Sequence, residues 1–394
     1  MANITLFSQI ISKLDRSKFN KLVKVKQTDK HCKGYTSWTH LVSMLFCQFA
    51  KSQSVRDISN GLRSATGNLN HLGIDRAPSK SSISYQNKHR DHELFKEYYF
   101  QLLESLGQHP KFKQVKFRIK SKIFLLDSTT ISLCLSLFDW AKYKTAKGAV
   151  KMHTLLDFDG NLPAYVNITD GKTADNKGAN DIPLLKGSVI VADRFYNDFP
   201  LLNVWDSKGV FFVIRHKENL QFETLKENNL PDNRHQHILK DEIICLKNES
   251  SKSKYPGKLR RVSVWDEENK QVIELITNQF NWSPNTIGEL YKSRWQVEIF
   301  FRDIKQLLHI KSFIGTSENA VMIQIWTALI TILILKALKA QSQFGWYLSN
   351  LVAFIRLNLF VKIDLQLWLD KPFKEHIEPP PKTIQGFYFE NIEN

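Results

Sequence analysis

The chain has few of the residues that mark secreted, disulfide-bonded or zinc-binding proteins. Its 394 residues include four cysteines, Cys32, Cys47, Cys134 and Cys245, and no two of them form a CxxC pair. Isolated thiols argue against a zinc site and fit a reducing, cytoplasmic setting. The first residues, MANITLFSQI, lack the basic-then-apolar pattern of a signal peptide, so we expect no targeting segment.

Long apolar runs are also scarce. The most apolar segment, residues 320–338, reads AVMIQIWTALITILILKAL, but Gln324 interrupts it and Lys336 closes it after fewer than a dozen fully apolar residues. We therefore predict a buried core helix rather than a membrane span, and no membrane partner.

Several common catalytic motifs are missing. The chain has no glycine-rich phosphate loop, no nucleophile elbow and no HExxH pair. These absences argue against nucleotide hydrolases, α/β-hydrolases and zinc proteases, and we expect no nucleotide cofactor.

Acidic residues are scarce in the first third of the chain. Residues 1–126 hold 22 Lys and Arg against 8 Asp and Glu, whereas the remainder is nearly balanced at 33 against 31. This surplus indicates a polyanionic partner, most simply nucleic acid. An anionic membrane is the competing partner, but the basic run lacks a strongly apolar helix face.

Residues 1–105 show apolar residues three and four positions apart, which predicts an all-helical domain. Gly73 and Pro78 mark a turn, and Ser79 is a suitable N-cap for a polar, basic helix that follows. This order is typical of a helix-turn-helix DNA-binding domain, while the alternative is an ordinary helical bundle with a solvated face. The side chains expected to reach base edges are Lys80, Ser81, Ser82, Gln86, Asn87 and Arg90.

The middle of the chain alternates strands and helices. The apolar strand IFLL ends at Asp127, a hairpin with its turn at residues 159–161 follows, and the apolar strand SVIVA ends at Asp193. A buried strand that ends in a carboxylate places the charge at a sheet edge, where a ligand can reach it. A helix at 199–209 and a strand at 210–215 complete this part.

Composition divides the rest of the chain. Residues 216–280 show short alternating strands, polar turns and no helix pattern, so we predict a β-rich insertion. The expected organisation is a DNA-binding domain at 1–105, a core in two parts at 111–215 and 281–345 around the insertion at 216–280, and a helical tail at 346–394.

Four polar residues stand at helical spacing after the insertion. Tyr291, Arg294, Glu298 and Lys305 have offsets of 0, 3, 7 and 14, which place them within about 60° of one helix face. The opposite face carries Val297, Phe300, Phe301, Ile304, Leu307 and Leu308. A carboxylate among cations can hold a divalent metal while the cations bind phosphate. A solvated helix with charge pairs is the alternative, and spacing alone does not decide.

Asp127, Asp193 and Glu298 thus lie on three different elements that converge in a ribonuclease-H-like sheet. Three carboxylates around two hard cations about 4 Å apart form a two-metal phosphoryl-transfer site. Asp157 and Asp159 flank a turn and are expected to form it. Asp170 and Asp175 could contact metal, but we favour a solvated loop for both. His153 could contact DNA or orient a carboxylate, but we favour a hydrogen-bonded histidine on a strand.

These residues resemble the DDE transposases of bacterial insertion sequences, in the group with a Tyr-Arg-Glu-Lys motif and a β-rich insertion before the catalytic Glu. The resemblance covers residues 110–345, with 66 residues between the two aspartates and 105 from Asp193 to Glu298. The N-terminal helices resemble an accessory DNA-binding domain of some members. Many relatives have Gly where this chain has Phe195, which puts the local turn in doubt.

The resemblance implies a role for each matching residue. Asp127, Asp193 and Glu298 would hold two Mg²⁺ ions, with Mn²⁺ as a substitute. Tyr291, Arg294 and Lys305 would bind phosphates at the transposon end. An aromatic platform for a flipped base would be Trp295, with Trp282 and Trp265 as the other candidates.

The implied fold is α/β: a ribonuclease-H-like mixed sheet with flanking helices, interrupted by a β-rich insertion and preceded by the helical domain. The implied function is cutting element ends and joining them to target DNA in a bacterial nucleoid, with double-stranded DNA as partner and a homodimer in the synaptic complex. The alternatives are a structure-specific metal-dependent nuclease and a catalytically inactive DNA-binding repressor.

Overall fold

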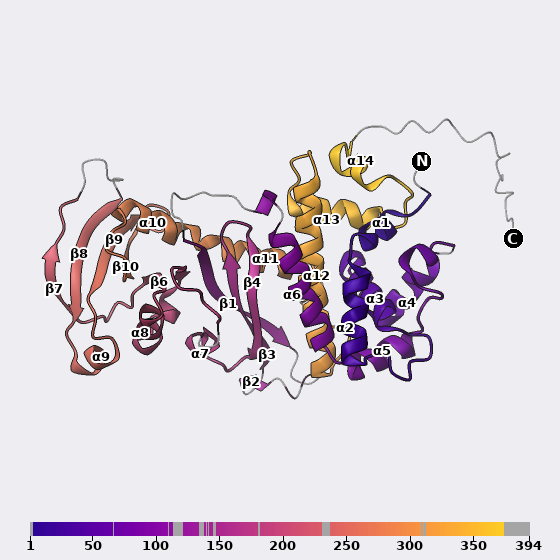
Figure 1. Ribbon diagram of the computed structural model, residues 1–394, viewed down its shortest axis with the longest axis horizontal. Coiled ribbons are helices and arrows are strands. Elements are labelled where there is room, and N and C mark those ends of the chain that lie inside the picture. The colour runs from indigo at the N-terminus through magenta and orange to yellow at the C-terminus, as the bar shows by residue number, and fades with distance from the viewer. Residues whose placement is uncertain are drawn as a thin grey trace, which may run out of the picture.

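A mixed sheet lies on one side of the molecule and a bundle of helices on the other, with a long helix between them (Figure 1). The computed structural model describes residues 3–65, 67–108, 110–112, 121–133, 138, 140, 142–144, 147–179, 182–230, 237–308, 310 and 313–373. The predicted tail beyond residue 373 and Cys134 lie outside these ranges.

The centre of the sheet has five strands: β1 (Ile123–Leu133), β3 (Lys147–Asp157), β4 (Leu162–Asp170), β5 (Val189–Ala192) and β6 (Phe211–Arg215). Their spatial order is β4-β3-β1-β5-β6. β3 and β4 pair antiparallel in a meander from β1, whereas β5 and β6 run parallel to β1. This order and these directions are those of the ribonuclease-H-like fold, as predicted.

The inserted strands extend the same sheet. β10 (Gln271–Thr277) pairs antiparallel with β6, and β9 (Leu259–Asp266), β8 (Ile238–Leu246) and β7 (Phe222–Glu227) follow in order toward the far edge. At the other end, β2 (Lys142–Lys144) pairs with the start of β3. The insertion also contains a short helix, α9 (Glu249–Lys254), capped by Asn248. The sequence pattern of this β-rich insertion did not indicate α9, because a local cap is enough to start one helical turn.

A buried ion pair ties the insertion to the helix that follows it. Arg260 on β9 bonds Asp241 on β8 through Nε at 2.8 Å and Nη2 at 2.7 Å. Its Nη1 donates to the carbonyl oxygens of Phe280 and Trp282. The segment that enters α10 (Pro284–Ser293) is thereby held against the sheet, since a buried guanidinium needs all these acceptors.

The long helix α12 (Glu318–Gln341) forms the core between sheet and bundle (Figure 1). It is long and apolar enough to cross a membrane by composition alone, but 89% of its most apolar window is buried inside the protein. Gln324 and Thr327, which would be costly in lipid, are buried and hydrogen-bonded here. The predicted core helix agrees with this placement.

The bundle consists of N-terminal and C-terminal helices together. Its members are α1 (Leu6–Ser12), α2 (Arg16–Lys26), α3 (Ser37–Ala50), α4 (Val55–Ser64), α5 (Lys80–His89), α6 (Glu93–Gly107), α13 (Leu348–Leu357) and α14 (Leu365–Asp370). α3 and α6 pack directly on α12, and one hydrophobic core runs from the bundle into the sheet. A fragment of residues 1–105 would expose the apolar faces that α12 covers, so tests of DNA binding need the whole chain.

The helix predicted to carry Tyr291 to Lys305 is two helices, α10 and α11 (Trp295–Leu307), which meet at Arg294. The Ser293 hydroxyl donates to the Leu290 carbonyl oxygen at 2.6 Å, a bond that competes with the helical pattern. The predicted apolar face is nevertheless buried, as Val297, Phe300, Phe301, Ile304 and Leu308 show.

Candidate active site

Asp127 lies within β1 and not at its end, because the strand continues to Leu133. The sequence suggested otherwise since the apolar run stops there, but Ser and Thr continue the pairing with β3. β1 and β5 pair in parallel up to Leu126 and Ala192, so Asp127 and Asp193 occupy the next matching positions. Neighbouring strands lie about 4.8 Å apart, which brings the two aspartates side by side.

Each aspartate is also held locally by a backbone amide. The Asp127 carboxylate accepts the N–H of Ser128 at 2.7 Å, and the Asp193 carboxylate accepts the N–H of Arg194 at 2.7 Å. Asp193 caps a 3₁₀ turn, η4 (Arg194–Tyr196), that begins where β5 ends. These contacts orient the carboxylates away from the apolar strands that precede them.

Glu298 reaches the aspartates from α11, which packs on β1. Arg294 connects them: its Nη2 lies 2.7 Å from Glu298 Oε1 and its Nη1 lies 3.5 Å from Asp127 Oδ2. The Arg294–Glu298 contact is an ordinary pair four residues apart on a helix. Asp127 comes from a different element, however, so the group is more than a solvated helix face.

The electrostatics of the group confirm how close its members are. The pKa of Asp127 is raised to about 7: burial is the largest cause and the charges of Asp193 and Glu298 add to it, while the Ser128 amide and Arg294 act in the opposite direction. Burial lowers the pKa of Arg294, but Tyr291 and the carboxylates outweigh burial and raise it overall. The negative charges of the three neighbouring carboxylates are therefore partly balanced by the positive charge of one guanidinium.

The donor chemistry of this group fits a hard divalent cation. All three side chains offer carboxylate oxygens, which Mg²⁺ and Mn²⁺ prefer, and a cation already lies between two of them in the form of the Arg294 guanidinium. In the part of the chain that the structure describes, no three His, Cys, Asp or Glu residues surround a single point.

The other residues of the predicted helix face surround this group. Tyr291 is 9% exposed, and its ring centroid lies 5.7 Å from the Arg294 guanidinium carbon. Trp295 is 58% exposed at the start of α11, whereas Trp282 packs on Phe211. Lys305 is half-buried two turns beyond Glu298. Of the three tryptophans, Trp295 offers the most open ring.

Comparison with known families decides the classification. Residues 118–334, more than half of the chain, match the model of the transposase DDE domain. The chain belongs to this family. All three carboxylates and Arg294 lie inside the matched range.

Curated relatives agree with the DDE transposase assignment. The chain is 30% identical over 240 residues to a probable transposase of insertion sequence element IS5377 from Geobacillus stearothermophilus, covering 61% of this chain and 63% of that protein. It is 29% identical over 262 residues to a putative transposase, y4zB, of Sinorhizobium fredii, covering 66% and 71%. A solved piggyBac transposase synaptic complex with hairpin DNA gives a TM-score of 0.42 at 9% identity, over 95% of this chain and 81% of that one.

The N-terminal helices lie outside the DDE match, and residues 2–75 match a domain of unknown function, DUF4372. Ser79 caps α5 as predicted, by accepting the N–H of Ser82. Residues 65–79 separate α4 from α5, which is longer than the turn of a helix-turn-helix.

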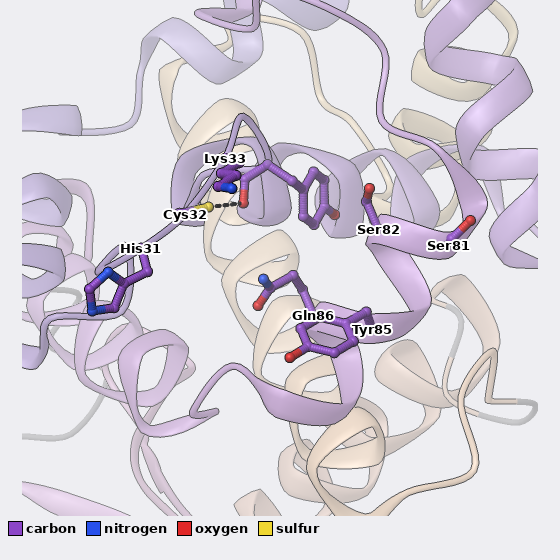
Figure 2. Close-up of a pocket in the computed structure, with 8 residues that line it drawn as sticks. His31, Cys32, Lys33, Ser81, Ser82, Tyr85 and Gln86 are labelled. Carbon is purple, nitrogen blue, oxygen red and sulfur yellow. Dashed lines mark hydrogen bonds between the residues drawn. The ribbon is translucent and has the colours of Figure 1, made fainter.

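A groove of about 340 Å³ lies beside α5 (Figure 2). Its lining comes from the loop before α3 and from α5: His31, Cys32, Lys33, Tyr35, Ser81, Ser82, Tyr85 and Gln86. Lys80 is exposed next to it. The predicted contact residues Lys80, Ser82 and Gln86 therefore all lie at or beside this groove.

Arg90 does not share this surface, and its predicted role in reading bases was wrong. It is 3% exposed, and its guanidinium donates to the carbonyl oxygens of Thr36 and Tyr35 and pairs with Asp29. Asn87 is buried too, bonded to His40 at 2.7 Å. Both residues hold α5 against the bundle, because a buried polar group needs such partners.

One part of the site was missed by the sequence analysis. Asp175, expected in a solvated loop, accepts hydrogen bonds from Lys151 and from Ser128, the residue that follows Asp127. Asp170 does behave as a turn residue, bonded to Thr173. The available signal was Lys151, because with His153 it places two polar groups on one face of a strand, between Ala149 and Leu155.

Proposed function

We propose that the protein is the transposase of a bacterial insertion sequence, of the group with the Tyr-Arg-Glu-Lys motif. It would cut the ends of its element and join them to target DNA by two-metal phosphoryl transfer. One observation carries the proposal: within the DDE match, Arg294 bridges Asp127 and Glu298, which are far apart in sequence, and Asp193 follows the strand beside Asp127. The names of the curated relatives support the same function.

Each residue of the site has a role in this chemistry. Asp127, Asp193 and Glu298 would hold the divalent ions, Mg²⁺ or Mn²⁺, which supply an activated oxygen nucleophile and charge neutralisation at the leaving oxygen. Arg294 and Lys305 would bind phosphates that flank the scissile bond. The Tyr291 ring, which lies against the Arg294 guanidinium, would hold that guanidinium in place. Trp295, exposed three residues before Glu298, would stack on an unpaired base.

The basic N-terminal third would bind the same DNA. Its surplus of positive charge and the groove beside α5 suit a phosphate backbone, with Ser82 and Gln86 as hydrogen-bonding groups. The partner is double-stranded DNA, from the element ends and the target, and two protomers would hold two ends in a homodimeric synapse. The expected location is the nucleoid of the bacterial cytoplasm.

The test of this function is a reaction with the full chain, DNA carrying its own element ends, a target duplex and Mg²⁺. We expect nicks, hairpin ends and joined products on a denaturing gel. Cleavage without any joining would favour a structure-specific nuclease. Specific binding with no cleavage in either Mg²⁺ or Mn²⁺ would favour a repressor.

The groove beside α5 makes a separate prediction about binding. In the full chain, Lys80→Ala should weaken binding of every duplex to a similar degree and reduce the slope of log affinity against log salt by about 1, because one phosphate contact releases about one counterion. Lys240→Ala is the matched control, since Lys240 is exposed on β8 at the distant end of the sheet. Equal slopes for the two variants would remove Lys80 from the DNA interface.

A further inference from the structure

A short helix near the candidate active site has no role in the proposed chemistry. α7 (Asp175–Ala179) lies beside β3 (Figure 1), and it packs both on β3, the neighbour of the strand that carries Asp127, and on η4, the turn that Asp193 caps. Its first two residues are polar and both are hydrogen-bonded to other elements.

The first residue of α7 is bonded to the Asp127 strand. The Asp175 carboxylate accepts a short hydrogen bond from the Ser128 hydroxyl, and Ser128 directly follows Asp127. Lys151 on β3 donates to the same carboxylate at 3.2 Å and to the Thr173 carbonyl oxygen at 2.9 Å. Asp175 is thus bonded to two adjacent strands of the sheet.

The second residue of α7, Asn176, is bonded to the segment that follows Asp193. Asn176 Nδ2 donates to Asp198 Oδ2 at 2.9 Å, and Asp198 caps α8 (Phe199–Ser207) through its other oxygen. Asp198 follows Asp193 after the single turn η4. Consecutive residues of α7 therefore connect β1, which carries Asp127, to Asp198 in the segment that follows Asp193.

The packing of α7 leaves it little freedom to shift. A Cβ atom added to Gly178 would lie 2.4 Å from His153 Nδ1, so only glycine allows this close approach to β3. The His153 ring is fully buried and its Nε2 bonds Thr169 Oγ1 at 3.0 Å. Tyr196, in η4, is buried with its hydroxyl near Ser128, Asp127 and Asp175.

We propose that α7 sets the separation of Asp127 and Asp193, with Asp175 and Asn176 as positioning residues that act through Ser128 and Asp198. The inference rests on the proposed function, in which the two aspartates hold metal. Outer residues that orient metal ligands typically contribute 10–100-fold to metal affinity or activity. α7 would belong to this class while touching neither metal nor DNA.

The test is a titration of the full-length, DNA-free protein with Mn²⁺. The electron paramagnetic resonance signal of free Mn²⁺ measures how much of the metal is bound. Asp175→Asn should weaken binding by about 10-fold, because the amide turns an N–H toward Lys151 or Ser128. Asn176→Ala and Ser128→Ala should weaken it by a smaller factor. Ser128→Thr should restore wild-type binding, since it keeps the hydroxyl.

Two reference variants separate this inference from the proposed function. Asp266→Asn removes a partly exposed carboxylate at the end of β9, in the β9–β10 hairpin, and should bind Mn²⁺ as wild type. Asp193→Asn should lose most binding. If Asp193→Asn binds normally, the proposed metal site fails. If Asp193→Asn is defective but Asp175→Asn and Asn176→Ala are normal, the role of α7 fails alone.

A direct metal contact by Asp175 would also overturn the inference. In that case Asp175→Asn would be defective while Ser128→Ala and Asn176→Ala bind as wild type, because neither removes a charged ligand. Thermal melting of every variant accompanies the titrations. If Asp175→Asn does not fold, Asn176→Ala decides, since it removes one hydrogen bond at the end of α7 that faces Asp198.

Discussion

Asp127→Asn, Asp193→Asn and Glu298→Gln are each expected to reduce cleavage of the element end by more than about 100-fold, the upper end of what residues behind metal ligands contribute. Each change removes a ligand charge from a group in which three carboxylates meet. Binding of the end in the absence of metal should stay close to wild type, because phosphate contacts come from Lys and Arg. Gel assays for cleavage and for binding measure the two effects separately.

Asp170→Asn is a suitable control for this series. Asp170 is exposed, and its carboxylate is bonded within its own turn to Thr173. This variant should cleave as wild type. Near-normal cleavage in Mg²⁺ by any one of the three amide variants would show that its residue is not a metal ligand.

Arg294→Ala should weaken binding of the element end and impair the steps that follow the first nick. Its guanidinium lies between Asp127 and Glu298, where it can contact phosphates beside the metals in a bidentate way. Lys305→Ala should have a smaller effect, because Lys305 lies about 10 Å further along α11 at 1.5 Å per residue. Binding and cleavage assays, run beside thermal melting, test both changes.

The structure adds a second consequence for Arg294. If the carboxylates hold metal as proposed, the guanidinium would compete with it for Asp127 and Glu298, and Arg294→Ala should bind Mn²⁺ at least as well as wild type while it loses DNA. Arg294→Lys keeps the charge without the planar fork and should recover part of the binding. Lys292→Ala, two residues away on the exposed side of α10, is the matched control.

If Arg294→Ala and Lys305→Ala cleave normally, this helix face has only surface pairs worth about 0.5 kcal/mol.

The candidate carboxylates could be predicted from sequence because each one follows or joins a strongly patterned element. The apolar runs before Asp127 and Asp193 are buried strands, and the period of Val297, Phe300 and Ile304 defines a buried helix face. The residues around them were harder to interpret. Arg90 resembled a DNA-contacting arginine, yet backbone carbonyl groups of a loop more than fifty residues away bind its guanidinium.

The sequence alone determined much of this protein: the apolar strands before Asp127 and Asp193, the core helix predicted at 320–338 and the basic first third. It could do so because periodicity and charge are local properties of a chain. Only the tertiary structure decided which polar groups contact each other across the fold. It placed Arg294 between Asp127 and Glu298, bonded Asp175 to Ser128, and joined the N-terminal helices to α12 in one core. Such contacts depend on burial and on partners distant in sequence, which no local pattern specifies.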